Sequence, residues 1–391
     1  MARISLVSGI CMLPDAISYS VVAKANAISG LGLSADVRVF SHQSNWNDPR
    51  SVTVNSAVEL AADEFFRTSD IVCYEFGIHY SLFDTIFLLP RSVKKAAVYH
   101  NITPLQFAAD DRSRQIIRRS LTQRANLMYC DHVACVSSFN RAELLAFGLP
   151  PERATVLNLP LKLPFTPTPQ ALPDARDPIE ILFVGRFVPS KGVLDLVEAA
   201  ARAMRAGASV RVSLVGDTTF SDPDYLAQIE RAIGASRHPE AFQFVGSVSA
   251  EDLAAHYGRA HIVAIASYHE GYCLPVIEAL SSGCAVATYD AGNLPYIVNG
   301  LGRIVQTGDA RALGDAIFDL AEALADTSVA PEERRLPLDC GRLSAHELRE
   351  RSAEYLQRFS VEAYQEGVRD LFARLGVGER RPAAQAHASV S

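Results

Sequence analysis

Two short segments in the second half of the chain combine residue types that bind phosphate and sugar groups. In the first, Arg186 and Lys191 stand between Gly185 and Gly192, directly after a short apolar run. A guanidinium fork and an ammonium group both bind phosphate oxygens, and the amides that open a helix favour anions. The spacing Gly-x-x-x-x-Gly-Lys-Ser/Thr of nucleotide triphosphatases does not occur here. The segment predicts a cradle for a diphosphate, and a solvated basic turn is the alternative.

The second segment holds two carboxylates, Glu270 and Glu278, eight residues apart. Pro275 lies between them, which indicates a loop that runs into a helix. Because the segment follows the apolar run 262–266, it lies at the carboxyl end of a predicted strand, where α/β proteins bind ligands. Ionised carboxylates accept hydrogen bonds from the paired hydroxyls of sugars and riboses. The alternative is a surface acid followed by a helix acid that the helix dipole stabilises.

Together the two segments resemble the retaining family-4 glycosyltransferases of the GT-B fold, with a dense match from about 179 to 298. The resemblance implies that Arg186 and Lys191 hold the diphosphate of a nucleotide-sugar donor. It also implies that Glu270 contacts the sugar hydroxyls and Glu278 the ribose. The donor-binding positions implied in this way are Gly9, Gly185, Arg186, Lys191, Glu270, Gly271, Tyr272, Cys273, Leu274 and Glu278.

A histidine in the first half extends the resemblance. The sequence Tyr-His-Asn-Ile-Thr-Pro at 99–104 follows a predicted strand and is similar to the histidine-bearing loop of one branch of these transferases. In that branch the histidine lies against the donor sugar, so a catalytic role is implied for His100. The other implied catalytic residues are Arg186, Lys191 and Glu270. A purely structural histidine is the alternative. Ser138, in a segment that also matches the branch, is predicted to cap a helix.

Three positions depart from the family pattern. Gly9 is the only glycine in the loop 8–15, where many members carry a pair. Cys273 replaces a common glycine, and Tyr296 stands where a glutamate is usual. The first departure puts the role of Gly9 in question, and the last removes any charge-based role at position 296.

Two further groups of residues are candidates for the acceptor side. Glu75 and His79 come just after the predicted strand 71–74. The stretch 112–124 holds five arginines and no acid. The structural interpretation of these arginines is a solvated helix face. The functional interpretation is a surface that binds anionic lipid or a diphospholipid acceptor.

One acidic pair imitates a metal site. Asp222-Pro223-Asp224 has the Asp-x-Asp pattern that binds metal in the other major glycosyltransferase fold. However, proline is favoured at the first helical position and aspartate at the N-cap before it. The pair therefore predicts a helix start.

The elements that must position these residues alternate along the whole chain. Short apolar runs and helical stretches follow one another, which predicts βαβ units with parallel sheets. The predicted strands are 4–7, 37–40, 71–74, 96–99, 133–136, 155–157, 179–184, 210–215, 242–245, 262–266 and 285–289. Helices are predicted over 15–31 and, with Ser360 as N-cap, to about 375.

The segment 160–178 carries six prolines and is the best linker candidate. We therefore expect an α/β, GT-B fold of two Rossmann-like parallel-sheet domains that face a central cleft. Residues 1–165 would form the acceptor-side domain and 166–358 the nucleotide-sugar domain. Residues 359–376 would form a helix that packs back on the first domain, and 377–391 a disordered tail.

Composition narrows the class of protein. The 391 residues have a net charge of −7, so no basic field exists to hold nucleic acid. No apolar run reaches membrane-spanning length, and the first residues lack the pattern of a signal peptide. The seven cysteines form no Cys-x-x-Cys pair, which excludes a zinc knuckle and favours reduced thiols. We expect a cytoplasmic protein, with peripheral contact at the inner face of the membrane as one interpretation of the arginines.

The expected reaction follows from the resemblance. A hexose-type sugar would pass from a nucleoside-diphosphate sugar to a hydroxyl of a glycan, glycolipid or polysaccharide precursor, with retained anomeric configuration. The partners are this donor and a glycan or lipid-linked acceptor. No metal and no cofactor are expected, because cations of the protein meet the diphosphate. The alternatives are a sugar-nucleotide epimerase, a sugar-phosphate synthase, or a non-catalytic nucleotide-sugar-binding protein.

Overall fold

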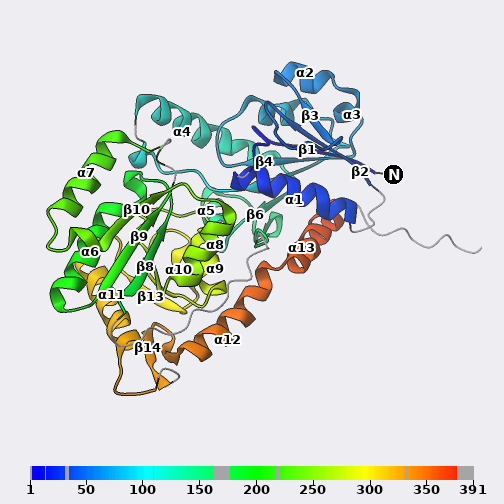
Figure 1. Ribbon diagram of the computed structural model, residues 1–391. Coiled ribbons are helices and arrows are strands. Elements are labelled where there is room, and N and C mark those ends of the chain that lie inside the picture. Colours follow the sequence, from blue (N-terminus) through cyan, green and yellow to red (C-terminus); the bar gives the residue numbers. More distant parts are fainter. Residues whose placement is uncertain are drawn as a thin grey trace, which may run out of the picture. The chain divides into compact units, whose positions relative to one another are not determined.

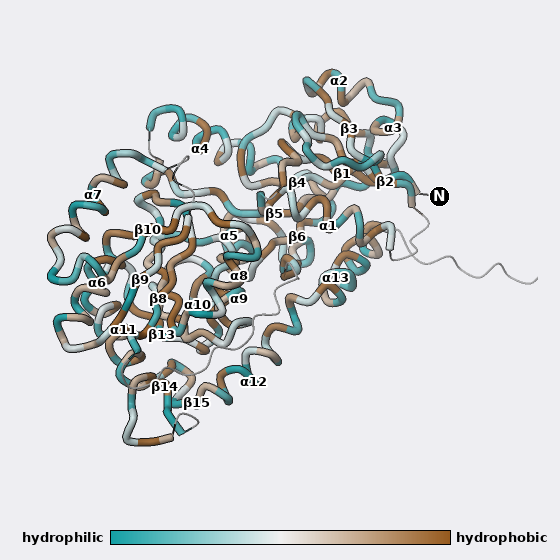
Figure 2. The backbone as a smooth tube through the Cα atoms, in the orientation of Figure 1, coloured by the Kyte–Doolittle hydropathy of each residue, from teal (hydrophilic) through white to brown (hydrophobic). Residues whose placement is uncertain are grey.

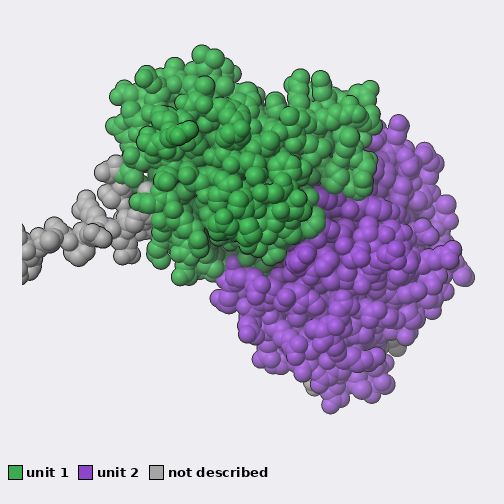
Figure 3. All heavy atoms as spheres, turned by 180° about the vertical axis from the view of Figure 1, so that it is seen from behind, with its two compact units in different colours: residues 1–160, 359–391 green, residues 161–358 purple. Residues whose placement is uncertain are grey.

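The computed structural model describes residues 2–13, 15–30, 35–108, 110–161, 177–216, 218, 221–330 and 333–376. The chain divides into two compact units, which Figure 3 colours separately. Unit 1 comprises Met1–Pro160 and Phe359–Ser391, and unit 2 comprises Leu161–Arg358. Most of the predicted linker, residues 162–176, and the predicted tail, residues 377–391, lie outside the described residues.

Unit 1 is built on a seven-stranded parallel sheet with the order β3-β2-β1-β4-β5-β6-β7. The central strand β4 (Ile71–Phe76) is buried along its whole length, as expected for a parallel strand covered on both faces. The order reverses between β1 and β4, so this is the switch point at which α/β sheets bind ligands. The other strands are β1 Ala2–Val7, β2 Ala35–Ser41, β3 Ser51–Thr53, β5 Lys94–Tyr99, β6 His132–Cys135 and β7 Ala154–Val156.

The helices of unit 1 include one from the far end of the chain. Helix α13 (Val361–Arg374) lies beside α1 (Ala16–Gly30) in Figure 1, and the Tyr364 hydroxyl donates to the Ser20 carbonyl at 3.3 Å. The remaining helices are α2 Ala57–Ala62, α3 Glu64–Arg67, α4 Asp111–Gln123 and α5 Ser138–Phe147. Short 3₁₀ turns occupy η1 Ser81–Leu88, η2 Leu105–Phe107, η3 Arg124–Tyr129 and η4 Pro151–Arg153.

Unit 2 repeats the same winding on a six-stranded parallel sheet with the order β10-β9-β8-β11-β12-β13. Its switch point lies between β8 (Ile179–Val184) and β11 (Ile262–Ile265), the two strands that precede the predicted binding segments. The other strands are β9 Val210–Val215, β10 Phe242–Gly246, β12 Ala285–Tyr289, β13 Gly302–Val305 and the antiparallel pair β14 Arg335–Leu338 and β15 Gly341–Ser344.

The helices of unit 2 cover this sheet, and several begin at capped positions. Ser344 and Glu347 form a capping box at the start of α12 (Ala345–Leu356). The other helices are α6 Val193–Ala206, α7 Pro223–Gly234, α8 Ala250–Arg259, α9 Leu274–Ser281, α10 Leu294–Val298 and α11 Ala310–Ala325. The 3₁₀ turns are η5 Pro189–Lys191, η6 Pro239–Ala241 and, at the boundary between the units, η8 Gln357–Phe359.

Each predicted strand is present, and its ends differ from the prediction by at most two residues. The prediction missed β3 and β13, since β3 is a short edge strand and β13 begins with a glycine and carries an arginine. It also missed the hairpin of β14 and β15. The predicted helices over 15–31 and 361–375 are confirmed as α1 and α13, and Ser360 caps α13 through the Ala363 amide.

Two predicted caps have different outcomes. Asp222 caps α7, because its Oδ1 accepts from the amides of Asp224 and Tyr225 at 2.9 and 3.3 Å, which confirms the prediction for this acidic pair. The prediction that Ser138 caps α5 is wrong: Ser137 is the N-cap, and its hydroxyl accepts from the Asn140 amide at 3.1 Å. Ser137 caps the helix because its backbone is extended, as an N-cap requires, whereas Ser138 is already the first residue of the helix.

Candidate functional site

The two predicted binding loops of unit 2 contact each other at the switch point. The Tyr268 amide, after β11, donates to the Ser190 carbonyl, after β8, at 2.9 Å. Gly192 opens α6 with a φ of +61°, and a Cβ there would overlap the Ala266 carbonyl. Glycine is therefore required both for the left-handed backbone and for the close approach of the loops. Packing this tight fixes the position of Lys191, which immediately precedes Gly192.

Lys191 and Glu270 form an ion pair across this contact. The Lys191 Nζ donates to Glu270 Oε1 at 2.6 Å, and the Ser267 hydroxyl donates to the same oxygen at 2.9 Å. Burial lowers the pKa of Lys191, but the neighbouring Glu270 carboxylate raises it more, so the ammonium stays charged. Among the described residues, Glu270 Oε2 has no hydrogen-bond partner. The pair thus presents a fixed cation beside a carboxylate oxygen that can accept hydrogen bonds from hydroxyls.

A third loop, after β12, supports the Glu270 loop. The Asn293 amide donates to the Glu270 carbonyl, and Asn293 Nδ2 donates to the Tyr272 carbonyl, both at 2.8 Å. Gly292 has a φ of +58°, and a Cβ at this position would overlap the Glu270 carbonyl. The backbone around Gly271 and Tyr272 is therefore held from two sides. Such support keeps a binding loop close to one geometry before any ligand arrives.

Helix α9 places the second carboxylate, Glu278. The helix begins at Leu274 after Cys273, whose φ of +77° is left-handed and whose thiol is buried. Burial raises the pKa of Cys273 well above its ordinary value, so the thiol stays protonated. The Tyr257 hydroxyl, from α8, donates to Glu278 Oε2 at 2.7 Å. The predicted loop-to-helix transition at Pro275 is confirmed, and Tyr257 fixes the orientation of the carboxylate.

Arg186 differs from Lys191 in its surroundings. The Arg186 side chain is exposed, and no ion pair joins it to another residue in the described part of the chain. Gly185, at the end of β8, is packed under Gly216, where a Cβ would overlap the Gly185 carbonyl. Arg186 therefore projects from a rigid backbone position with its five donors available for an anion.

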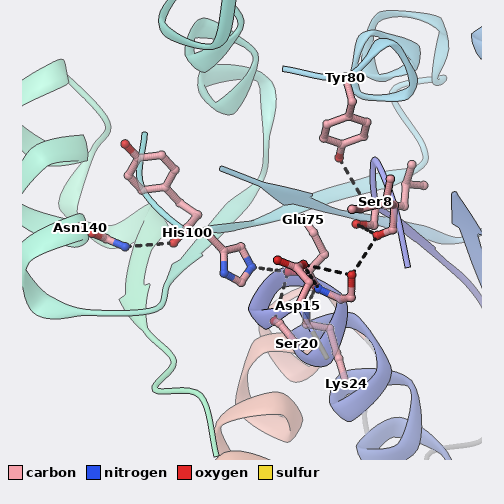
Figure 4. A network of polar contacts seen from close by, with 12 residues as sticks. Ser8, Asp15, Ser20, Lys24, Glu75, Tyr80, His100 and Asn140 are labelled. Atoms are coloured by element: carbon pink, nitrogen blue, oxygen red, sulfur yellow. Dashed lines mark hydrogen bonds and ion pairs between the residues drawn. The ribbon is translucent and has the colours of Figure 1, made fainter. Parts of the chain in front are cut away.

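In unit 1 the predicted His100 lies on a buried carboxylate. The His100 Nε2 is 2.6 Å from Glu75 Oε2, and Glu75 also binds Lys24 and Ser20 (Figure 4). Glu75 is only 2% exposed, and both of its oxygens are occupied. The prediction that Glu75 lines an acceptor site is therefore revised: its carboxylate lies beneath His100 and has no oxygen to offer a substrate. Gly9 packs against Tyr80: a Cβ added to Gly9 would lie 3.1 Å from the Cβ of Tyr80.

His79 lies in a separate hollow of unit 1. A cavity of about 470 Å³ is lined by His79, Asp84, Gln115, Arg118, Arg119, Thr122, Gln123 and Asn126. Its wall is one side of α4, which Figure 2 shows as predominantly hydrophilic. The His79 amide donates to Ser120 Oγ at 2.8 Å and so ties the loop after β4 to this helix. Arg118 and Arg119 have no acidic partner among the described residues, so the cavity offers two cations to an anion.

The described part of the chain offers neither a cluster of metal ligands nor a membrane-spanning helix. No three His, Cys, Asp or Glu side chains gather there as ligands for a metal ion. None of the described helices combines the length and the apolar composition that are needed to cross a bilayer.

Several residues that shape the site have no local signal in the sequence. Tyr257, Gly292 and Asn293 reach the site from other elements, and Lys24 lies on a helix that carries no binding motif. Ser267 had one usable signal, since it stands three residues before Glu270 at the end of a strand. The spacing of motifs finds residues that contact a ligand but not the residues that support them.

Comparison with known proteins agrees with this geometry. The family model "Glycosyl transferases group 1" matches residues 166–328, a segment that lies within unit 2. A D-inositol 3-phosphate glycosyltransferase from Nocardia farcinica is 37% identical over 123 residues, which is 30% of this chain. The matched segment spans only 27% of that relative's length.

Solved structures are similar over nearly the whole chain. A sucrose-phosphate synthase from Thermosynechococcus elongatus has a TM-score of 0.72 at 20% identity and covers 96% of this chain and 99% of its own. Anabaena HepE in complex with UDP has a TM-score of 0.66 at 14% identity, with coverage of 95% and 100%. The two parallel α/β units have the GT-B fold, as the sequence predicted.

Proposed function

We propose that this protein is a retaining glycosyltransferase that transfers a hexose-type sugar from a nucleoside-diphosphate sugar to a hydroxyl of a glycan, glycolipid or polysaccharide precursor. The observation that carries the proposal is the Lys191–Glu270 pair at the switch point of unit 2. It joins a diphosphate-binding cation to a sugar-binding carboxylate within a glycosyl transferases group 1 domain. Unit 2 is accordingly assigned to the donor and unit 1 to the acceptor.

The chemistry assigned to the site is electrostatic. Bond cleavage places growing negative charge on the departing diphosphate, where Arg186, Lys191 and the amides at the start of α6 stabilise it. Glu270 Oε2 accepts hydrogen bonds from the sugar, and Glu278, oriented by Tyr257, accepts them from the ribose. The leaving diphosphate takes up the acceptor proton as the acceptor hydroxyl attacks from the same face. Since cations of the protein meet the diphosphate, no divalent metal is required in this scheme.

The acceptor is assigned to the cavity beside His79. Arg118 and Arg119 would pair with an anionic group, and the polar wall with hydroxyls. The name of the Nocardia relative, which refers to inositol 3-phosphate, supports an acceptor that carries phosphate. A lipid-linked phosphate would also bring this face of α4 to an anionic membrane surface. Flotation with anionic vesicles at low salt distinguishes a lipid-linked acceptor from a small soluble one, since only the lipid-linked acceptor requires the protein to bind vesicles.

Other reactions on the same fold remain as alternatives. A sugar-nucleotide epimerase would invert a centre of the donor, a sugar-phosphate synthase would act on a free sugar phosphate, and a binding protein would turn nothing over. The family match favours glycosyl transfer over these. Product analysis with a radiolabelled donor distinguishes transfer, epimerisation and binding without turnover.

The donor site is tested by thermal shift with a nucleoside diphosphate in EDTA. Ligand at a hundred times its Kd should stabilise the protein by about 2.7 kcal/mol. Arg186→Ala should lose most of this shift, whereas Arg205→Ala removes an exposed cation at the opposite end of α6 and should keep it. Loss of the shift in EDTA, with recovery on adding magnesium, would overturn the metal-independent scheme. An equal effect of both variants would overturn the role of Arg186.

A further inference from the structure

Three ionisable side chains meet in the interior of unit 1. Lys24 from α1 is fully buried, Glu75 from β4 is 2% exposed, and the His100 side chain is 5% exposed. The Lys24 ammonium binds Glu75 Oε1, and His100 Nε2 binds Oε2, so the carboxylate lies between the two bases (Figure 4). Burying charges costs several kcal/mol per ion, so an arrangement like this requires a compensating role or very complete pairing.

The pairing of Glu75 decides the protonation of the His100 ring. Ser20 Oγ donates to Glu75 Oε2 at 3.1 Å, beside the contact from His100. Burial raises the pKa of Glu75, but the Lys24 ammonium and the hydrogen bond from His100 outweigh burial and lower the pKa below its ordinary value. An ionised carboxylate can only accept hydrogen bonds. The His100 Nε2 must therefore carry a proton, and in the neutral ring Nδ1 then carries the lone pair.

The backbone around His100 is fixed as firmly as the ring. The His100 amide donates to the Phe76 carbonyl at 2.8 Å. Asn101 has a left-handed φ of +80°, and its Nδ2 donates to Asn140 Oδ1 at 3.0 Å and to Glu143. A Cβ on Gly77 would lie 3.0 Å from the Cβ of His100. Strained backbone that side chains hold in place is common at functional sites, which supports a role for the ring beyond packing.

Lys24 decides the charge of the ring. Without it, the buried Glu75 carboxylate would be balanced only by a proton on the imidazole. The ammonium already balances the carboxylate, so the ring has no uncompensated anion to neutralise. The other ionisable groups around the carboxylate are Cys11, Cys73, Tyr80 and Tyr364, whose pKa values burial raises, and the exposed Asp15, which bonds Ser18. The thiols and phenols are therefore uncharged near neutral pH.

We propose that Lys24 and Glu75 are positioning residues that hold His100 as the neutral tautomer with Nε2 protonated and Nδ1 as the acceptor. The inference rests on the proposed function in one respect, namely that a substrate hydroxyl donates to Nδ1. No residue in the described part of the chain forms a hydrogen bond with Nδ1, which leaves this nitrogen for such a ligand. A ring in this state binds a hydroxyl but cannot donate from Nδ1 to a phosphate oxygen.

Nitrogen-15 NMR of histidine-labelled protein tests the tautomer directly, with the His100 signals assigned through His100→Gln. The wild type should show Nε2 protonated and Nδ1 unprotonated at pH 7.5. His132 is an internal reference that stays neutral, because burial lowers its pKa to about 4. In Lys24→Met the His100 ring should be doubly protonated at pH 7.5, since the carboxylate then lacks its counter-ion. Ser20→Ala removes an uncharged donor from the same oxygen and should leave the tautomer unchanged.

Kinetics give the second readout. The double variant Lys24→Met/Glu75→Gln removes both buried charges, so it leaves no unpaired ion in the core. Its kcat should fall by about 10- to 100-fold, the range typical of partners that orient a ligating histidine. Its Kd for the nucleoside diphosphate should not change.

Several outcomes would overturn the proposal. They are a wild-type ring protonated on Nδ1, a wild-type ring doubly protonated at pH 7.5, or a folded Lys24→Met variant whose His100 nitrogen signals match those of the wild type. If Lys24→Met does not fold, the wild-type tautomer still decides. The NMR result needs no substrate, so an absence of glycosyl transfer would refute the proposed function and leave the positioning of His100 intact.

Discussion

Replacing Lys191 with methionine removes its charge and keeps most of its length. The Nζ–Oε1 separation of 2.6 Å corresponds to a Coulomb attraction of about 6 kcal/mol at an effective dielectric constant of about 20. Desolvation offsets most of this attraction, since the two side chains are only 23% and 11% exposed. A hydrogen bond between charged groups retains about 1.5–3 kcal/mol, which is the coupling energy we expect between Lys191 and Glu270.

The assay is a double-mutant cycle with Lys191→Met, Glu270→Gln and the double variant, followed by thermal unfolding. For a unit of this size about 1 kcal/mol changes Tm by about 2–4 °C, so each single variant should lower Tm by about 3–12 °C. The double variant should lose less than the sum. Additive losses, with coupling below about 0.5 kcal/mol, would refute the pairing.

The pH dependence of the same pair has a definite sign. The pKa of Lys191 is raised in the folded protein, because the effect of Glu270 exceeds that of burial. The stabilisation is therefore complete below the ordinary lysine pKa of about 10.4 and is lost as pH rises through the raised value. The Tm difference between wild type and Lys191→Met should shrink above about pH 10.4. A difference that stays constant through the alkaline range would contradict this assignment.

Catalysis should respond more strongly than stability. If the diphosphate gains charge as its bond to the sugar breaks, loss of the Lys191 ammonium should lower kcat by about 10²–10³-fold. Arg205→Met, which removes an exposed cation of the same unit, is the matched control. Wild-type turnover in a folded Lys191→Met variant would refute the assignment of the phosphate cradle.

Three further predictions concern packing and support. A thiol reagent should modify one cysteine, Cys340, in the native protein and seven after denaturation. Labelling of more than one native thiol would contradict the burial of the others. Gly192→Ala should lower the free energy of unfolding by about 2–5 kcal/mol, because backbone strain and steric overlap add. Gly207→Ala, with open space around it, should lower it by about 1–2 kcal/mol, and equal losses in urea unfolding would refute the loop contact. Tyr257→Phe should raise KM for the donor with little change in kcat, since a ribose contact persists in both states; an unchanged KM would separate Glu278 from the nucleotide.

The local patterns of the sequence determined the elements and the positions of the binding loops. Strands β8 and β9 are rich in apolar, β-branched residues, and their observed bounds match the predicted ones. Asp222 before Pro223 sets the start of α7 for a reason confined to three residues. Since parallel strands end at one edge of a sheet, the position of a motif after a strand also placed the loops of Lys191 and Glu270 at a binding edge.

The tertiary structure decided which side chains meet. From the sequence, Glu75 is predicted to be a carboxylate at the end of a strand that is open to a ligand. Only the fold shows that Lys24 and His100 form hydrogen bonds with its two oxygens. Tyr257 and Glu278 lie on different helices, and nothing in the residues around either predicts the other. The physical reason is the distance along the chain over which each signal acts. Strand and cap signals arise from neighbours in the chain, whereas an ion pair between distant residues depends on how whole elements pack, which local sequence does not encode.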